Sequence, residues 1–535
     1  MSNEPRTVII SGATSGLGLA LARTYAARGD RLVLLGRQPR KALDAQFFTD
    51  ETYCQVDLAD PGCAVAVGHF LRERGIAAVD LLIHNAGIGF HGSVARQDPD
   101  NVCALVAVNL RAPIALSHAL LPALWRAGGT IAFIGSVAAA LPVPEYAVYG
   151  ATKGALEGFA RSLRVELAGQ VAVRVIHPGA IRTAMHAKSG MAIGAVAWRR
   201  YPSPERVAMQ VVRAIEHGPA TTALGPANRA LRFAGRHGAG IVDALARQRG
   251  LRYVDTAPQQ SGREASEAAT RHCVITGAAD GIGRALAHAF GAAGYVITGI
   301  DRDAALSART GTELAERGIA ATFIHADLTV RADVDRLLDR LAGLGRLDCL
   351  IHCAGISAVG RFAGSNLAAQ DRVLDLNLLA PLLLTGGLLA RQRLARGGTL
   401  VFLASLSCFT GYPGAAVYAA SKDGVASYAR SIRVGLAATG MRVLTVYPGP
   451  TRTAHARRYS PDNRREARRM PPEQLAAQVL AAVQAGQHTL IPGKGNRAFA
   501  LFGRLAPGLA DCAMRKALLD KLDRARRLRG GVGGD

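Results

Sequence analysis

The two halves of this 535-residue chain carry the same short motifs in the same order. The spacing between equivalent motifs stays nearly constant. It is 265 residues at Gly12 and Gly277, and it reaches 270 residues at Pro178 and Pro448. Self-similarity of this kind indicates a duplicated domain in which only loop lengths have changed. The repeat therefore constrains the chain to two copies of one fold.

Length and composition suit two globular domains. Hydrophobic residues make up 49% of the chain and charged residues 19%, which is typical of proteins that bury a core. The segment 256–269 is rich in Pro, Gln, Ser and small residues, as linkers are. We expect a first domain over residues 1–252, a linker over 253–270, and a second domain over 271–535 that ends in a basic tail.

Short apolar segments alternate with helical patterns in each half, which is typical of βαβ units on a parallel sheet. Residues 7–10 form the first expected strand, and a helix is expected to follow over residues 16–28. The other expected strands are residues 31–35, 80–84, 130–134, 171–176 and 441–446. The predicted fold class is α/β, with two tandem Rossmann-type, doubly wound parallel-sheet domains.

A glycine-rich loop lies between the first expected strand and helix of each half. Glycines let the backbone turn sharply and approach a pyrophosphate, whose charge is met by amide groups at the helix N-terminus. The strand–loop–helix context is present twice, which argues against a simple tight turn. The predicted cofactor-binding residues are Gly12, Ser15, Gly16, Leu17 and Gly18 in the first half, and Gly277, Asp280, Gly281, Ile282 and Gly283 in the second.

The residue after the second strand differs between the halves. The first half has Gly36-Arg37, with Lys41 nearby, whereas the second has Asp301-Arg302. A carboxylate here accepts hydrogen bonds from an adenosine ribose and repels a 2′-phosphate, whereas an arginine attracts that phosphate. We therefore expect Arg37 to favour NADP(H) in the first domain and Asp301 to favour NAD(H) in the second.

A tyrosine precedes a lysine by four residues in each half, at Tyr149 and Lys153 and again at Tyr418 and Lys422. On a helix, residues four apart lie on one face, so the ammonium group lies near the phenol. A neighbouring cation favours the ionised phenol and lowers its pKa, which suits a tyrosine for acid–base work. A serine stands thirteen residues before each tyrosine. The pattern predicts two oxidoreductase sites.

Together these motifs resemble the short-chain dehydrogenase/reductase family, and the two copies cover nearly the whole chain. The resemblance implies hydride transfer between a nicotinamide and a carbonyl or alcohol carbon. It implies that tyrosine exchanges the proton, serine holds the substrate oxygen, lysine binds the nicotinamide ribose and lowers the tyrosine pKa, and asparagine positions a water. The implied catalytic residues are Asn109, Ser136, Tyr149 and Lys153, and Asn377, Ser405, Tyr418 and Lys422.

The resemblance also implies further positions along the cofactor. These are Asp57, Leu58, Asn85, Gly87, Pro178 and Gly179 in the first half, and Asp327, Leu328, Ala354, Gly355, Pro448 and Gly449 in the second. The second half departs from the family pattern at Cys353, where asparagine is usual. We expect this change to affect cofactor affinity or stability rather than the proton transfer.

The net charge of +24 suggests anionic partners. Basic residues gather in three segments, 199–252, 452–469 and 515–529, yet no nucleic-acid-binding module accompanies them. A surface from an arginine-rich proteome is the simpler explanation of most of the excess. The eight scattered cysteines and the N-terminal pattern favour reduced thiols in the cytoplasm. Cys349 and Cys353 are interpreted as core residues, and no metal site is expected.

The segments after the Pro-Gly motifs differ, and they suggest different substrates. In the first half, residues 183–198 form an apolar lid suited to a hydrophobic ketone or acyl chain. In the second, His455 and the arginines up to Arg469 suit a carboxylate, a phosphate, or a thioester of CoA or a carrier protein. A solvated arginine-rich helix is an equally good interpretation.

Three hypotheses stay open. The favoured one is a bifunctional enzyme for a secondary alcohol or ketone, in which opposed cofactors could invert a hydroxyl stereocentre. In the second, one half is active and the other completes an internal pseudo-dimer. The third is a nucleotide-sensing or membrane-surface scaffold that uses residues 514–529 as a weak peripheral anchor.

Overall fold

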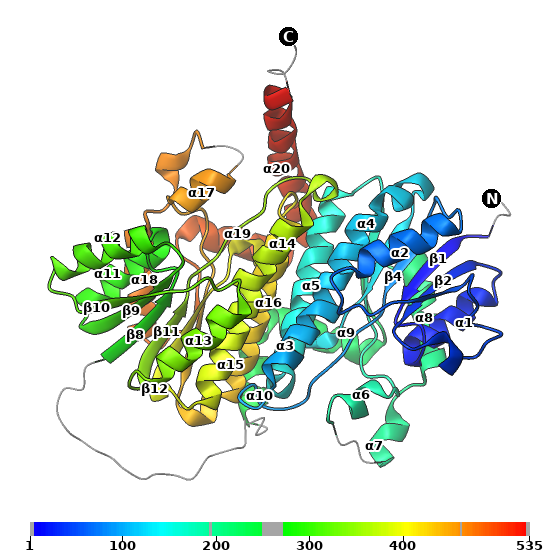
Figure 1. The fold of residues 1–535 in the computed structure, drawn as a ribbon, viewed down its shortest axis with the longest axis horizontal. Coiled ribbons are helices and arrows are strands. Elements are labelled where there is room, and N and C mark those ends of the chain that lie inside the picture. The colour runs from blue at the N-terminus through cyan, green and yellow to red at the C-terminus, as the bar shows by residue number, and fades with distance from the viewer. Residues whose placement is uncertain (1–4, 192–194, 249–270, 461–462, 531–535) are drawn as a thin grey trace.

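Two seven-stranded parallel sheets form the framework of the protein (Figure 1). The computed structural model describes residues 5–191, 195–248, 271–460 and 463–530. The strand order is β3-β2-β1-β4-β5-β6-β7 in the first half and β10-β9-β8-β11-β12-β13-β14 in the second. The strands are β1 Thr7–Ser11, β2 Arg31–Gly36, β3 Tyr53–Gln55, β4 Leu81–His84, β5 Thr130–Ile134, β6 Ala172–His177, β7 Thr221–Ala223, β8 Arg271–Thr276, β9 Tyr295–Asp301, β10 Ala321–His325, β11 Leu347–His352, β12 Leu394–Leu403, β13 Arg442–Val446 and β14 Thr489–Leu490.

The central strands are apolar on both faces because helices cover both sides of each sheet. In β1, Ile9 contributes to one core, while Val8 and Ile10 contribute to the core on the opposite face. This is the alternation expected of a strand, in which successive side chains point to opposite sides. The prediction of two doubly wound parallel sheets is therefore confirmed.

Helices cover the sheets in two layers. On the outer faces, α1 packs against α8 and α11 against α18. On the inner faces, α2, α4 and α5 of the first half and α13, α15 and α16 of the second contribute to one continuous core. The helices are α1 Gly16–Ala26, α2 Cys63–Glu73, α3 Pro99–Val106, α4 Ala112–Ala127, α5 Ala147–Glu166, α6 Met185–Lys188, α7 Ala195–Arg200, α8 Pro204–His217, α9 Pro226–His237, α10 Ala239–Gln248, α11 Gly281–Ala292, α12 Ala304–Ala315, α13 Arg331–Ala342, α14 Leu367–Leu374, α15 Ala380–Ala390, α16 Ala416–Gly435, α17 Ala454–Tyr459, α18 Pro472–Gln484, α19 Lys494–Leu505 and α20 Pro507–Gly530.

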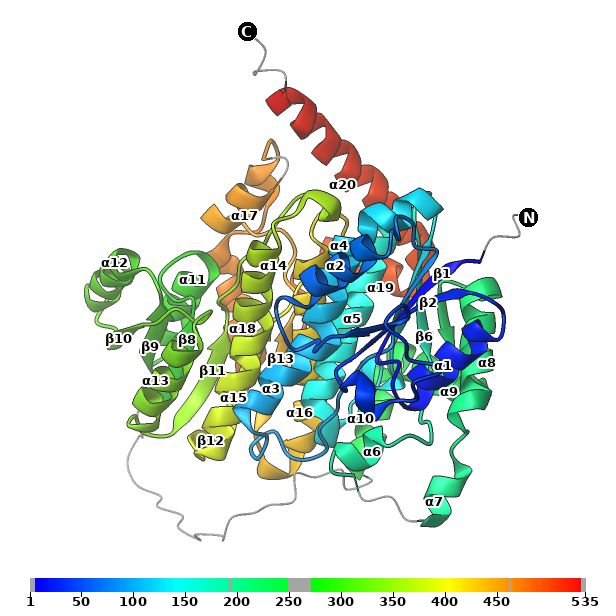
Figure 2. The same cartoon turned by 45° about the vertical axis from the view of Figure 1, so that its right-hand side comes forward.

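The two halves meet along α5 and α16, which lie side by side at the centre of the molecule (Figure 2). Small residues allow this close approach. A Cβ atom added to Gly154 would lie 2.8 Å from the Cβ of Ser427, and one added to Gly158 would lie 2.0 Å from Oδ2 of Asp423. The four-residue spacing of Gly150, Gly154 and Gly158 places them on one helix face. The pair of halves is thus an internal pseudo-dimer.

Two long helical segments beside this interface are apolar enough to span a bilayer by length and composition. They are Pro99–Ala127 and Leu367–Ala390, and 61% of the most apolar window of each is buried in the protein. Both contribute to the shared core between the sheets. Burial on several sides explains their apolar composition.

The C-terminal helices of each half cross to the opposite half. Helix α10 of the first half packs on α16, and α20 packs on α5. Asp243 in α10 accepts hydrogen bonds from Arg430 and Arg433, while Asp511 in α20 accepts one from the amide of Gly411. The expected tail therefore begins as a packed helix. The expected linker, residues 253–270, lies outside the described residues.

Candidate active sites

A turn of π-helix holds each predicted asparagine. Asn109 lies in the π-helical turn Ala107–Arg111, and Asn377 lies in the equivalent turn Asp375–Leu379. Both side chains are buried. Asn109 Nδ2 donates to Ile88 O at 3.0 Å, and its Oδ1 accepts from Ile88 N at 2.9 Å. Asn377 makes the same two bonds with Ile356. Such π-bulges are frequent at functional sites, and here they turn the asparagine toward the loop after the fourth strand.

The first half brings Ser136, Tyr149 and Lys153 together with this asparagine. Ser136 follows β5 and stands close enough to the phenol of Tyr149 to lower its pKa. Lys153 Nζ donates to Ile134 O at 3.1 Å and lies 5.8 Å from the centroid of the Tyr149 ring. A Cβ atom on Gly87 would lie 3.5 Å from Lys153 Nζ, so Gly87 keeps the space beside the ammonium group open. The four residues form one cluster at the carboxyl ends of the strands.

The second half repeats this geometry. Ser405 stands close enough to the phenol of Tyr418 to lower its pKa, and Lys422 Nζ donates to Leu403 O at 2.9 Å. Lys422 Nζ also lies 5.8 Å from the Tyr418 ring centroid. Gly355 stands beside Lys422 and Asn377 as Gly87 does in the first half. The four residues and their contacts with neighbouring groups therefore recur in the second site.

In the structure, burial is the largest influence on the pKa of each tyrosine, and the expectation that the lysine lowers this pKa remains a prediction. Burial raises the pKa of Tyr149 to about 12, although Ser136 opposes it, and burial also raises the pKa of Tyr418. Each lysine donates a hydrogen bond to a backbone carbonyl, Ile134 O or Leu403 O. Burial lowers the pKa of both Lys153 and Lys422 to about 8. The tyrosines are therefore protonated near neutral pH.

The glycine loops have no room for side chains. A Cβ atom on Gly12 would lie 2.9 Å from the Cα of Ala86, and one on Gly18 would lie 2.1 Å from Gly12 O. In the second half, Gly277 and Gly283 are equally crowded. Gly12 and Gly277 also have positive φ angles of 67° and 69°, which side chains disfavour. The backbone itself therefore forms the surface of each loop, as close approach to a pyrophosphate requires.

Other predicted cofactor positions border the same loops. Ser15 and Asp280 precede α1 and α11, whose first residues include Gly16, Leu17, Gly281 and Ile282. Asp57 and Asp327 each accept a hydrogen bond from the amide two residues ahead, and Leu58 and Leu328 beside them are buried.

Asn85 Nδ2 donates to Ser11 O at 3.0 Å. Cys353 stands in the equivalent place, with its pKa raised to about 12 by burial, and a thiol does not supply the amide's strong donor.

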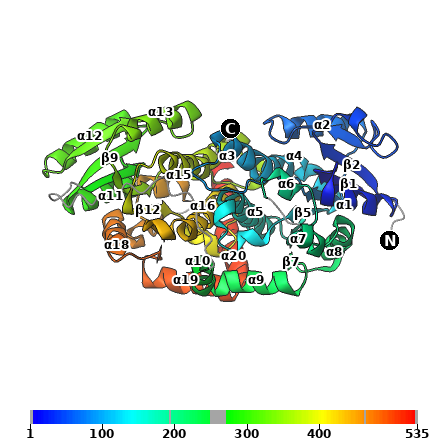
Figure 3. The same ribbon diagram turned by 90° about the horizontal axis from the view of Figure 1, so that it is seen from below.

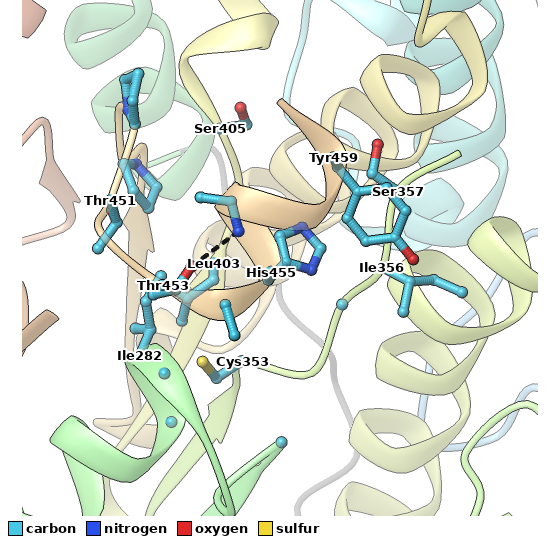
Figure 4. Close-up of a pocket in the computed structure, with 18 of the residues that line it drawn as sticks. Ile282, Cys353, Ile356, Ser357, Leu403, Ser405, Thr451, Thr453, His455 and Tyr459 are labelled. Carbon is cyan, nitrogen blue, oxygen red and sulfur yellow. Dashed lines mark hydrogen bonds between the residues drawn. The ribbon is translucent and has the colours of Figure 1, made fainter. Parts of the chain in front are cut away.

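A cavity of about 1300 Å³ in the second half joins the cofactor loop to the catalytic residues. Its wall includes Gly277, Asp280, Asp301 and Asp327 at one end, and Ser405, Tyr418 and Lys422 at the other. In the close-up, Cys353, Ser405, His455 and Tyr459 surround this space, and a hydrogen bond ends at Leu403 (Figure 4). The hydrogen-bond donors and the glycines that line this cavity suit a dinucleotide lying along it.

The two halves differ structurally at the last residue of the second strand, which is Gly36 in β2 and Asp301 in β9. Asp301 accepts hydrogen bonds from the amides of Ala279 and Asp303, both at 3.1 Å, so its carboxylate is fixed at the cavity wall. A Cβ atom on Gly36 would lie 2.6 Å from Thr14 Cγ2. The first half therefore leaves no room for a carboxylate here, and the exposed Arg37 follows instead.

Two asparagines near the Pro-Gly motifs were missed by sequence reasoning. Asn228 Nδ2 donates to Pro178 O at 3.3 Å, and a Cβ atom on Gly179 would lie 2.2 Å from that nitrogen. Asn496 stands in the same relation to Gly449, where the distance would be 2.6 Å. Asn228 of the first half recurs as Asn496 in the second half, and this repetition is the sequence signal that could have revealed both residues.

The loops that carry the catalytic serines are held by the opposite half. Tyr412 N donates to Ser162 Oγ at 3.1 Å, and Val143 N donates to Ser431 Oγ at 3.3 Å. Glu166, buried in α5, accepts bonds from the amides of Phe362 and Gly414. Each site is therefore supported across the central interface, which motif spacing alone did not reveal.

The side chains on the substrate side differ between the sites. In the first, the rings of Tyr146 and Tyr149 lie 5.8 Å apart, and Tyr146 OH is 3.2 Å from Ser189 Oγ. In the second, the rings of Tyr412 and Tyr418 lie 6.4 Å apart, and Arg469 acts electrostatically on Tyr412. Of the predicted apolar lid, residues 192–194 lie outside the described residues.

The family model for short chain dehydrogenases matches this chain twice, over residues 6–193 and 271–464. The chain belongs to the short-chain dehydrogenase family. The predicted tandem arrangement of two family members is therefore confirmed. Each match contains one complete asparagine, serine, tyrosine and lysine set together with its glycine loop.

Named short-chain dehydrogenases resemble parts of this chain. Dehydrogenase/reductase SDR family member 7B of Bos taurus is 39% identical over 190 residues, which cover 33% of this chain and 58% of that protein. The 1-deoxy-11-beta-hydroxypentalenate dehydrogenase of Streptomyces exfoliatus is 38% identical over 185 residues, covering 34% of this chain and 67% of that protein. A short-chain dehydrogenase structure from Sphingobium yanoikuyae in complex with NADPH is 27% identical, with a TM-score of 0.39, and covers 44% of this chain and 92% of that one.

Proposed function

We propose that this protein is a bifunctional NAD(P)-dependent oxidoreductase that interconverts secondary alcohols and ketones at two sites. The observation that carries this proposal is the repetition of the catalytic geometry. Lys153 and Lys422 lie at the same 5.8 Å from the rings of Tyr149 and Tyr418, and Ser136 and Ser405 stand beside those phenols. A copy kept only for support would be free to lose such an arrangement.

Each site handles a proton at a defined atom. The phenol of Tyr149 or Tyr418 donates a proton to the oxygen formed on reduction and accepts it back on oxidation, while Ser136 or Ser405 holds that oxygen. Asn109 and Asn377 fix the loop beside the lysine, which would bind the ribose next to the nicotinamide. A nicotinamide cofactor bound along the glycine loop supplies or takes up the hydride.

The cofactor preference would be opposed in the two halves. Asp301 is held at the cavity wall by two amides and suits a ribose diol, so the second half would use NAD(H). Gly36 has no room for a carboxylate, and Arg37 would attract a 2′-phosphate, so the first half would use NADP(H). Opposed cofactors would allow one half to oxidise a hydroxyl and the other to reduce it, which would invert a stereocentre.

The substrate sides support different preferences. Tyr146, Tyr149 and Met185 surround the first site and suit an apolar ketone or acyl chain. Arg465, Arg468 and Arg469 line the second cavity and suit a substrate with a carboxylate, a phosphate, or a thioester of CoA or a carrier protein. The alternative of one active half with a structural partner rests on the extensive interface between the halves.

A fluorescence titration of the full chain with NADH and NADPH, separately and together, tests the proposal. We expect one equivalent of each cofactor to bind independently. Two equivalents of a single cofactor would refute opposed preferences and indicate two similar reductases. Saturation at one equivalent in total would instead assign a structural role to one half.

A further inference from the structure

Exposed apolar side chains gather on one side of the protein. Among the side chains that the structure describes, fourteen large hydrophobic ones are exposed, and eight of them lie on α9, α10, α19 and α20. Helix α9 packs on α10 and α19 on α20, and α9, α10 and α19 lie along the lower edge of the molecule in Figure 3, where α20 begins. We call this surface the C-terminal face. Its apolar members are Leu231, Phe233, Ile241, Leu245, Leu501, Phe502, Leu505 and Leu509.

The exposure of these residues is large enough to need an explanation. Phe233 is 68% exposed, Ile241 70%, Leu505 69% and Leu509 67%. Single exposed apolar residues are normal, but a concentration on neighbouring helices marks a contact surface. The buried sides of the same helices are already used, because Asp243 bonds Arg430 of the second half there and Asp511 bonds the amide of Gly411. The apolar residues therefore lie on the exposed side of these helices, where a partner could bind.

The charged residues on the C-terminal face are basic. The exposed cations interleaved with the apolar residues are Arg229, Arg247, Lys494, Arg497, Arg504, Arg515 and Lys516. Within residues 226–248 and 494–519, the acidic residues are Asp243 and Asp511, and neither is exposed. Apolar side chains flanked by cations on surface helices are the composition that binds an anionic lipid interface.

Both copies of the repeat carry this pattern at equivalent positions. At one offset of 268 residues, Phe233 matches Leu501 and Ile241 matches Leu509, and three arginines match arginines. These arginine pairs are Arg229 with Arg497, Arg236 with Arg504, and Arg247 with Arg515. Exposed apolar residues elsewhere lack this symmetry. At the same offset, Val65 matches Asp333 and Met209 matches Ala477.

We propose that the C-terminal face docks the protein on an anionic membrane surface, with one amphipathic contact from each half. Apolar side chains would enter the headgroup region while arginines and lysines meet lipid phosphates. Two contacts on one rigid body bind more tightly than either alone, which explains why both copies carry the pattern. A second copy of this chain is the less suitable partner, because its face would bring the same positive charge.

Sedimentation with vesicles tests this proposal on the full chain. We expect binding to phosphatidylcholine vesicles that contain phosphatidylglycerol, weak or no binding to pure phosphatidylcholine, and loss of binding at high salt. The pair Phe233→Gln with Ile241→Gln, and the pair Leu501→Gln with Leu509→Gln, should each weaken vesicle binding by about tenfold. All four changes together should abolish it. Val65→Gln with Met209→Gln is the matched control and should bind as the wild type does.

Two results would overturn the proposal. Vesicle binding that depends on salt but not on the four apolar residues would show that general positive charge is sufficient. Absence of vesicle binding, together with a wild-type dimer that the four changes convert to a monomer, would show that the face joins two copies. Cofactor titration of every variant establishes that both sites are intact, so neither result arises from misfolding.

Discussion

Arg161 of the first half donates a hydrogen bond from Nη2 to Oδ2 of Asp423 in the second half, over 2.7 Å. Asp423 follows Lys422 directly, and Arg161 also donates to the carbonyl of Ser407, two residues after Ser405. Burial raises the pKa of Asp423 to about 6, although Arg161 opposes the shift. One arginine of the first half therefore neutralises and orders the catalytic segment of the second.

We predict that Arg161→Met destabilises the protein by about 3–5 kcal/mol, because it leaves the Asp423 carboxylate buried without its partner. Activity with the cofactor of the second half should fall more than activity with that of the first. Urea unfolding and separate NADH- and NADPH-dependent rates measure both effects. Adding Asp423→Asn should restore part of the stability, since the unpaired charge is then absent. Wild-type stability of Arg161→Met would contradict the role given to this pair.

Single substitutions at the tyrosines should separate the two activities. Tyr149→Phe removes the proton donor of the first site and should lower its rate by about 10²- to 10⁴-fold, while the second rate is unchanged. Tyr418→Phe should have the opposite pattern. Steady-state rates with each cofactor provide the measurement, and cofactor affinity is the control because neither phenol is assigned to nucleotide binding. If one of these variants changed no rate, that half would be structural.

Cofactor preference should depend on Asp301 and Arg37. Asp301→Asn removes the charge that disfavours a 2′-phosphate, so NADH should bind about tenfold more weakly to the second half and NADPH more tightly. Arg37→Gln should weaken NADPH binding to the first half by a similar factor. Fluorescence titration of each variant checks both expectations. Lys41→Gln is a nearby control that should have a smaller effect.

The second cavity should recognise negative charge through Arg469. This side chain is fixed by bonds from Nη2 to Ser460 Oγ and Asn463 Oδ1, and it acts electrostatically on Tyr412 beside the catalytic Tyr418. Arg469→Gln should raise KM for a ketone that carries a carboxylate by about tenfold, with little change in kcat. The uncharged methyl ester of the same ketone is the control. An equal loss with both substrates would instead indicate a structural role.

Stability in acid should depend on Glu157. Burial alone would raise its pKa, but Arg232 and His177 together hold the pKa well below the usual range. A carboxylate with a lowered folded pKa stabilises the protein above the ordinary pKa of 4.5, and this contribution is lost as the pH falls below that value. Glu157→Gln should therefore be destabilised at neutral pH and should lose less stability in acid than the wild type. Urea unfolding at about pH 7 and about pH 4 makes this comparison. An unchanged pH dependence would contradict the assignment.

Local sequence determined the repeat, the parallel sheets and the membership of each catalytic cluster. These features depend on short-range patterns: apolar strands of the right length, glycines at crowded turns, and residues four apart on one helix. Tyr149 and Lys153 must share a helix face whatever surrounds them. The contrast between Gly36 and Asp301 was visible for the same reason, because both stand at the end of a strand that the sequence marks.

Tertiary structure alone decided how the two copies depend on each other. The pairing of Arg161 with Asp423, the support of Tyr412 by Ser162 and the crossing of α10 and α20 join residues more than 160 positions apart. The tyrosine pKa was also decided there, since burial is the largest influence on it. Contacts and desolvation of this kind depend on which surfaces meet in three dimensions. The spacing of motifs within one copy does not predict which surfaces meet.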